Sequence, residues 1–201
     1  MWPPIDYLRW VRGPAASEGV RIPLLLSGMP PPDPSFLAGL DPAELVAGDG
    51  GDTPPLARAL AEHWKLPPEG VLLQPGSHWN ILLAVAARLD ERAGPVVVEE
   101  PAYEPLRRIP AALGAEVLRL PRGPERGWRV DIPALESLAA RRPSLLILSH
   151  PHNPSLAPLG EDEQEAVADF ARRTGCAVLS DEVYLEFLAD GEASSLRRRL
   201  P

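Results

Sequence analysis

Hydrophobic residues occur along this chain in short continuous runs, which are separated by longer stretches with helical spacing. Short apolar runs bounded by turn-forming residues are typical of strands that are buried on both faces. The sequence therefore predicts five strands, at residues 71–74, 95–99, 116–120, 144–149 and 176–180.

The stretches between the runs repeat apolar residues every three or four positions, which predicts helices. Thr53 and Asp131 precede two of them as candidate N-caps, and Gly175 follows the last as a candidate C-cap. An acidic first turn at residues 161–163 suits the positive end of that last helix dipole. Helices that alternate with buried strands predict an α/β fold, with a mostly parallel sheet and helices on both faces.

The first quarter of the chain differs from the rest in its proline content. The sequence has 26 prolines, and many of them lie in the first 70 residues. Proline lacks a backbone donor and disfavours the α conformation in the residue before it. We therefore expect residues 1–52 to form an extended N-terminal arm with turns, and residues 53–201 to form the α/β domain.

Composition narrows the class of protein. A chain of 201 residues that is 45% hydrophobic can bury a core. Its net charge of −8 argues against nucleic acid as a partner, and the basic run Arg197–Arg199 reads as a solvated tail. The single cysteine, Cys176, fits a reducing compartment and a place in the core. With neither a signal-like start nor a membrane-length apolar window, we expect a cytoplasmic protein that is not bound to a membrane.

Candidate chemistry lies just after the predicted strands, because ligands of parallel sheets bind beyond the carboxyl ends of the strands. Gly76 lets the chain turn sharply into a helix, whose first amides at Ser77 and His78 suit an anion. Taken alone, Ser77 reads equally as an N-cap. Tyr103 follows the next strand, where its ring can face a ligand or pack under a loop. Asn153 lies between two prolines as a rigidly placed amide.

The two histidines of the segment HPHNP do not predict a metal site, because no cysteine or HExxH-type partner accompanies them. Asp181 is harder to explain as structure. It ends an apolar run, and a buried carboxylate needs a partner or must be neutralised. A cationic ligand would meet this need.

Six segments, taken in order from about Leu24 to Leu196, resemble the motifs of one enzyme family. They are LLLSGMPPPD, PPLARALAEHW, QPGSHWNI, EEPAYEP, SHPHNPSLAPLG and LSDEVYLEF. The last three are similar to the motifs E-P-x-Y, P-x-N-P-T-G and D-E-x-Y. The family is the class I and II aminotransferases of fold type I, which use pyridoxal 5′-phosphate (PLP). Residues 53–201 would then be part of the family's large domain.

The resemblance implies a role for each candidate residue. Asp181 would pair with the protonated pyridine nitrogen of PLP, and Tyr103 would stack on its ring. Asn153 and Tyr184 would hydrogen-bond its phenolic oxygen. The segment Gly76, Ser77 and His78 would hold its phosphate, and Gly28 would lie near the substrate carboxylate. These are the cofactor-binding and substrate-binding residues that the sequence predicts.

The chain also departs from the family. The family's imine-forming lysine and phosphate-binding arginine follow the D-E-x-Y motif at positions beyond Pro201, and the only lysine here, Lys65, precedes the first predicted strand. The family's tyrosine that reaches the neighbouring subunit's phosphate is also missing. In addition, the family's sheet places two later strands between the first and the fifth strand predicted here.

Three interpretations remain open. The chain is an aminotransferase or a portion of one, acting on an amino acid and a 2-oxo acid. Alternatively, it is a non-catalytic protein that still binds PLP, or a C–S lyase or decarboxylase of the same fold. In each case no catalytic residue is assigned, and we do not expect this chain alone to transaminate efficiently. Exposed sheet edges and the family's two-fold interface predict a homo-oligomer.

Overall fold

The computed structural model describes residues 6–13, 33–39, 55–189 and 194–200, and these fall into two compact units, 6–74 and 75–200. The first unit contains the helices α1 (Asp6–Arg12) and α3 (Pro55–Trp64) and the 3-10 turns η2 (Pro34–Leu37) and η3 (Pro68–Gly70). The second unit contains the sheet and all the predicted site residues except Gly28, which lies outside the described residues.

The sheet has four strands: β1 (Val96–Glu100), β2 (Val117–Pro121), β3 (Leu145–Ser149) and β4 (Ala177–Asp181). All neighbours pair in parallel, in the order β2-β1-β3-β4. The register places Ser149 directly beside Asp181 at the end of β3 and β4. Four of the five predicted strands, and the mostly parallel sheet, are therefore confirmed.

The predicted strand at residues 71–74 is wrong. This segment belongs to no strand, and its Leu72 is 57% exposed. An apolar run becomes a strand only where a neighbouring strand binds its backbone groups. None of the four described strands pairs with this segment, and the backbone N–H of Val71 is used locally, donating to Pro68 O over 3.2 Å.

The remaining helices follow the predicted pattern. They are α4 (Ser77–Glu91), α5 (Glu104–Ala112), α6 (Ile132–Ser137) and α7 (Glu161–Thr174), with short 3-10 turns η4 (Pro124–Arg126), η5 (Leu138–Arg141), η6 (Leu185–Phe187) and η8 (Leu196–Arg199). The Asp131 side chain accepts from Ala134 N at 3.1 Å and caps α6 as expected. Gly175 ends α7 at φ 65°, a left-handed conformation that favours glycine.

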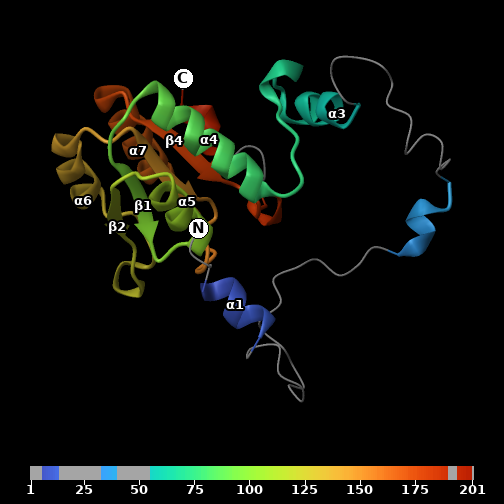
Figure 1. Ribbon diagram of the computed structural model, residues 1–201, viewed down its shortest axis with the longest axis horizontal. Helices are drawn as coiled ribbons and strands as arrows, with labels where there is room; N and C mark the ends of the chain where they lie inside the picture. Colours follow the sequence, from blue (N-terminus) through green and yellow to red (C-terminus); the bar gives the residue numbers. More distant parts are fainter. Residues whose placement is uncertain (1–5, 14–32, 40–54, 190–193, 201) are drawn as a thin grey trace. The chain divides into compact units, whose positions relative to one another are not determined.

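Helices cover both faces of the sheet, as Figure 1 shows. Successive strand residues point to opposite faces, so Val96 and Val98 pack on one side and Val97 on the other. The side with Val96 packs against α4 and α5 through Ile81, Val85, Leu106 and Ile109. The side with Val97 packs against α6 and α7 through Leu135, Val167 and Phe170. The central strands β1 and β3 are thus buried on both faces, which explains their continuous apolar sequence, whereas the edge strands β2 and β4 are more exposed.

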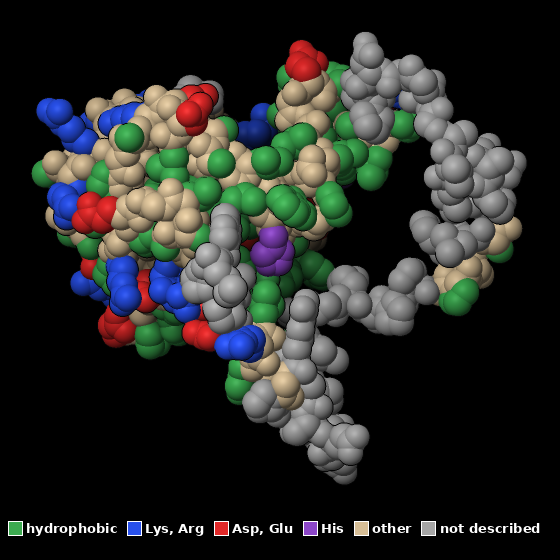
Figure 2. Space-filling model, viewed as in Figure 1, with side chains coloured by type: hydrophobic (Ala, Val, Ile, Leu, Met, Phe, Trp, Pro, Cys, Tyr) green, Lys and Arg blue, Asp and Glu red, His purple; other side chains and the backbone are tan. Residues whose placement is uncertain are grey.

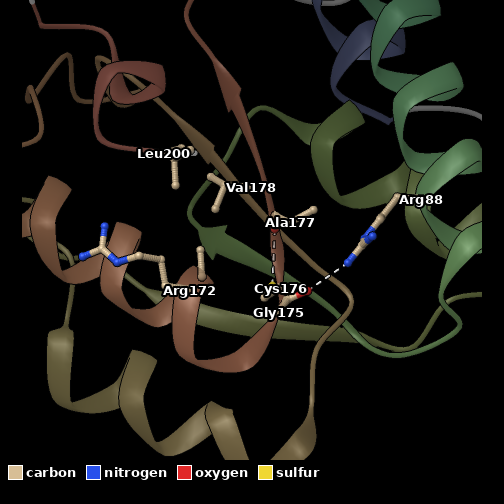
Figure 3. A pocket seen from close by; sticks show the side chains of 8 residues that line it. Arg88, Arg172, Gly175, Cys176, Ala177, Val178 and Leu200 are labelled. Carbon is tan, nitrogen blue, oxygen red and sulfur yellow. Dashed lines mark hydrogen bonds between the residues drawn. The ribbon is translucent and has the colours of Figure 1, made fainter.

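Two arginines at the carboxyl end of α4, Arg88 within the helix and Arg92 as its C-cap, bind the end of α7. Arg88 donates from Nη2 to Gly175 O over 2.9 Å and from Nε to Ser144 O over 3.1 Å. Arg92 Nη1 donates to Gly175 O and Thr174 O. Figure 3 shows Arg88 reaching Gly175 beside a cavity of about 430 Å³. These bonds join helices from opposite faces at the amino end of the strands, because α7 leads directly into β4.

Charged side chains of both signs are interspersed on the face of the sheet unit in Figure 2. Several form exposed ion pairs, such as Arg141 with Glu116 at 2.7 Å and Arg173 with Glu136 at 2.6 Å. Over the described part of the chain, no helix is both long and apolar enough to cross a membrane.

Candidate functional site

The loops that follow β1, β3 and β4 meet at one edge of the sheet, because parallel strands share a direction. A helix that leads into such a strand runs back along it, so the amino end of α4 comes to the same edge. The structure therefore gathers the predicted site segments around residues 76–78, 101–103, 150–154 and 181–184.

The amino end of α4 is built around Gly76. This residue is the N-cap at φ 88°, and a Cβ added to it would meet no heavy atom within 4 Å. The left-handed conformation, not lack of space, is what favours glycine there. Ser77 is then the first helical residue and is exposed, so it does not cap the helix itself. The first amides of a helix have no partner within it, and they lie here at the strand-end edge.

His78 and Tyr103 are joined across this edge. Tyr103 precedes α5 as its N-cap, and its hydroxyl lies 2.8 Å from His78 Nε2. The two rings also meet edge to face, with centroids 5.5 Å apart. The contact links the amino end of α4 to the loop after β1 and limits the rotation of the Tyr103 ring.

Asp181 is the last residue of β4 and is half-buried. Its Oδ1 accepts from Val183 N over 3.3 Å, and its backbone oxygen accepts from His150 N over 2.9 Å. Burial raises the pKa of the Asp181 carboxyl, and the bond from Val183 N and the charge of His78 oppose that rise in part. Among the described residues, no Lys or Arg forms an ion pair with this carboxylate, and its Oδ2 accepts no hydrogen bond. The site thus holds a carboxylate that lacks a strong cationic partner.

Asn153 lies half-buried in the loop after β3, where its backbone N–H donates to Ser149 Oγ over 2.8 Å. Tyr184 lies three residues after Asp181, and its ring contacts Phe187 at 6.2 Å between centroids. In the part of the chain that the structure describes, Tyr184 makes neither a hydrogen bond nor a ring contact with the other predicted site residues. The structure thus brings together His78, Tyr103 and Asp181, and it does not join Tyr184 to them.

The two histidines of HPHNP are fully buried and both serve structure. His150 Nδ1 accepts from Leu159 N over 3.1 Å, so its Nε2 carries the proton and donates to Ser194 O over 2.8 Å. His152 Nε2 donates to Pro101 O at 2.8 Å, while Nδ1 bonds to Ser155 Oγ at 2.6 Å. Burial, above all, lowers the pKa of His152. With both ring nitrogens engaged, neither histidine can ligate a metal, and no group of three potential metal ligands occurs among the described side chains.

Sequence reasoning missed a buried ion pair beneath these loops. Glu99 Oε2 lies 2.8 Å from Arg122 Nη1, and both side chains are fully buried. Glu99 Oε1 also accepts from Ser149 N over 2.6 Å and from Ser149 Oγ over 2.5 Å. The sequence did offer a signal for each residue. Glu99 continues the apolar run of β1, which is buried on both faces. Arg122 lies two residues after buried Leu120, with exposed Pro121 between them.

Comparison with known proteins matches this chain to one family. The family model "Aminotransferase class I and II" matches residues 45–200. A histidinol-phosphate aminotransferase from Symbiobacterium thermophilum is 34% identical over 132 residues, which cover 66% of this chain and 35% of that protein. An S-alkyl-thiohydroximate lyase from Arabidopsis thaliana is 28% identical over 143 residues, covering 68% of this chain and 31% of the relative.

A crystal structure of an aminotransferase from Mycobacterium tuberculosis is similar in fold. It superimposes with a TM-score of 0.62 at 26% identity, covering 71% of this chain and 39% of that one. The chain thus spans about a third of the length of the proteins that it matches.

Proposed function

Because the chain belongs to the class I and II aminotransferase family, we propose that its strand-end site binds pyridoxal 5′-phosphate for amino-group transfer between an amino acid and a 2-oxo acid. The family is generally PLP-dependent and acts on amino and 2-oxo acids. We propose the activity for the complete enzyme, in which this chain supplies the strand-end loops that bind PLP.

The observation that carries the proposal is the carboxylate of Asp181. It is half-buried, its pKa is raised by burial, and its Oδ2 has no partner among the described residues. A protonated ring nitrogen would supply the missing cation and would favour the ionised form of the carboxyl. PLP, when bound, supplies an electron sink for the charge that develops at the substrate carbon. Asp181 would keep that ring nitrogen protonated.

The amino end of α4 suits the phosphate of PLP. Gly76 turns the chain so that the backbone N–H groups of Ser77 and His78 begin the helix at the strand-end edge. A helix of 15 residues directs its positive end toward an anion placed there. The Ser77 hydroxyl is exposed and is free to turn toward the same anion.

The aromatic and amide side chains would hold the ring. Tyr103 is held at its hydroxyl by His78, and its ring would stack on PLP. Asn153 and Tyr184 would donate to the phenolic oxygen, and for Tyr184 this means turning from Phe187. Gly28 is proposed near the substrate carboxylate on the resemblance alone.

A titration with PLP tests this function. Asp181→Asn removes the charge that would pair with the ring nitrogen while it keeps the size of the side chain. We expect it to weaken PLP binding about tenfold or more, since hydrogen bonds to charged groups contribute about 1.5–3 kcal/mol. Asp90→Asn, an exposed aspartate on α4, is the matched control and should bind PLP like the parent chain. Isothermal titration in which Asp181→Asn binds as tightly as the parent would remove the proposed role of Asp181.

Two further functions are favoured by separate observations. The similarity to an S-alkyl-thiohydroximate lyase extends the proposal to a C–S lyase of the same fold, and a decarboxylase would use the same cofactor. For this chain by itself, whose single lysine, Lys65, directly follows α3 in the first unit, the alternative is binding of PLP without covalent attachment. Product analysis after incubation with an amino acid and PLP separates amino transfer, carbon–sulfur cleavage and binding alone.

We also propose a homodimer in the cytoplasm. Members of the family are usually dimers. In the described part of the chain, β4 has a strand partner on one side only, and such an edge invites pairing. The single, buried Cys176 supports a reducing compartment.

A further inference from the structure

The buried pair of Glu99 and Arg122 lies directly beneath the proposed cofactor loops. Glu99 ends the buried part of β1, and Arg122 follows β2. Through Ser149, at the end of β3, Glu99 also reaches the loop that carries Asn153. One carboxylate thus connects the carboxyl ends of three adjacent strands.

The directions of these hydrogen bonds follow from the charge of Glu99. An ionised carboxylate only accepts, so the Ser149 hydroxyl must donate its proton to Glu99 Oε1. The lone pairs of Ser149 Oγ then point away from Glu99, and one of them accepts the N–H of Asn153 over 2.8 Å. If the hydroxyl proton turned toward Asn153 instead, it would face the Asn153 N–H, and no lone pair would be directed at that donor. Glu99 therefore orients Ser149, and Ser149 holds Asn153.

Stability alone gives no reason for this ion pair. Arg122 donates from Nη1 to Glu99 and from Nε to Trp128 O over 2.7 Å. Its Nη2 is buried and donates to no described residue. A buried pair with an unsatisfied donor stabilises a fold no better than apolar side chains of similar volume. Apolar side chains, however, would give the Ser149 hydroxyl no acceptor, whereas Glu99 provides one in a fixed position.

The rest of the loop is fixed independently. His152 binds Pro101 O and Ser155 Oγ with its ring, and its backbone N–H donates to Ala157 O over 2.9 Å. The backbone of Asn153 adds the bond to Ser149 Oγ. Among the described residues, the Ser149 hydroxyl is the partner of the Asn153 backbone N–H, so the orientation of this peptide group depends on it.

We propose that Glu99, held in its ionised form by Arg122, is a positioning residue that orients the Ser149 hydroxyl and thereby fixes Asn153 at the strand-end site. Its effect on the backbone of Asn153 is independent of any cofactor. Its effect on PLP rests on the proposed function, in which the Asn153 side chain binds the phenolic oxygen.

Amide hydrogen exchange measured by NMR on the whole chain tests the first step. Ser149→Ala removes the acceptor and should speed exchange of the Asn153 amide about tenfold, given a net hydrogen-bond contribution of about 1 kcal/mol or more. Ser149→Thr keeps a hydroxyl and should restore slow exchange. Ser144→Ala is the matched control, since Ser144 is a buried serine preceding the same strand whose hydroxyl reaches only Gly94 O and Pro95 O.

Glu99→Gln tests the orienting step. Its amide presents one acceptor and one donor group, so a donor must face either Ser149 or Arg122. We expect faster exchange at Asn153, while amides in the middle of β3 keep their protection and show that the sheet is intact. Unchanged exchange at Asn153 in Glu99→Gln, or in Ser149→Ala, would overturn the proposal.

PLP binding and the absorbance of the bound cofactor test the second step. Ser149→Ala should raise the dissociation constant by about the factor seen for Asn153→Ala, and Ser149→Thr should reverse the loss. Ser149→Ala should also raise the pH at which bound PLP changes its absorbance, because the phenolate of PLP loses the Asn153 side chain as a hydrogen-bond donor. A purely structural role of Ser149 would not move this pH. If Asn153→Ala weakens binding and Ser149→Ala does not, the positioning role fails. If the parent chain binds no PLP, the proposed function fails, and the exchange rates still decide whether Glu99 positions Asn153.

Discussion

Replacing Glu99 or Arg122 singly should destabilise the fold far more than replacing both. Arg122→Met leaves a buried carboxylate without its cation, and Glu99→Leu leaves a buried guanidinium that cannot lose its proton. Breaking a buried pair in this way costs about 3–5 kcal/mol. Since domains have free energies of unfolding of about 5–15 kcal/mol, either single variant should lose a large share of its stability.

The double variant, Glu99→Leu with Arg122→Met, should lose less than either single variant. Both charges are gone, and the new side chains have similar volumes to the old ones. The main cost that remains is the buried N–H of Ser149, which donates to Glu99 in the parent chain. The Ser149 hydroxyl can rotate to another acceptor, and Trp128 O, which loses the Arg122 donor, belongs to a half-buried residue. A buried donor without a partner costs about 1–3 kcal/mol, which is the loss that we expect for the double variant.

The pH dependence separates the two single variants. Burial raises the pKa of Glu99, and the charge of Arg122 opposes that rise. In Arg122→Met this opposition is lost, so the folded protein holds the proton of Glu99 to higher pH than the unfolded chain does. Arg122→Met should therefore be most stable relative to the parent at low pH and lose stability as the pH rises through the folded pKa of Glu99. Glu99→Leu should show no such recovery in acid, because the guanidinium stays charged.

Urea unfolding followed by circular dichroism, for all four proteins at pH 5 and pH 8, measures these differences. Arg141→Met is the control, since Arg141 is an exposed arginine whose pair with Glu116 should contribute less than about 1 kcal/mol. The reasoning fails if the double variant loses the sum of the two single losses, because the two charges would then act independently.

Three other predictions follow from the site and the edge of the sheet. In the absence of PLP, Asp181→Asn should raise the free energy of unfolding at pH 7 by about 0.5–2 kcal/mol, as a single stabilising change commonly does. Burial raises the pKa of Asp181, so this gain in stability should vanish below the ordinary aspartate pKa. Chemical denaturation at several pH values checks this sign. Borohydride reduction of the PLP-treated chain followed by peptide mass mapping should find no pyridoxyl adduct on Lys65, and an adduct there, with amino transfer that Lys65→Ala abolishes, would show that the chain is sufficient by itself. Light scattering over a concentration series should report a dimer or larger species, and a monomer throughout would count against the proposed assembly.

Strands β1 and β3 could be predicted from the sequence because each is buried on both faces, which leaves a continuous apolar run. The apolar run within SLLILS at residues 144–149 needs no further information, since both helix layers cover β3. Residues 71–74 show the limit of this reasoning. Their apolar pattern is typical of a strand, but a strand also needs a second strand to hydrogen-bond with. Whether one is available depends on the whole sheet and cannot be seen in the segment itself.

The site was predictable in part. Asp181 could be found because it breaks an apolar run with a charge, and Tyr103 because it follows a strand end. The pair of Glu99 and Arg122 was not found, because the two residues are 23 positions apart and meet only when β2 lies beside β1. The contact of His78 with Tyr103 depends in the same way on α4 and the loop after β1 arriving at one edge.

The arginines at the carboxyl end of α4 also determine the direction of the helix axis, and with it the position of the amino end. A helix of 15 residues is roughly 22 Å long, with Arg88 and Arg92 fastened to Gly175 at one end and Ser77 at the other. If loss of these hydrogen bonds lets the helix axis tilt by roughly 3°, the backbone N–H of Ser77 moves by about 1 Å. A displacement of that size is enough to impair a binding site. Directed evolution of this protein should therefore recover changes in PLP affinity at Arg88 and Arg92, on the opposite rim of the sheet from the proposed phosphate site.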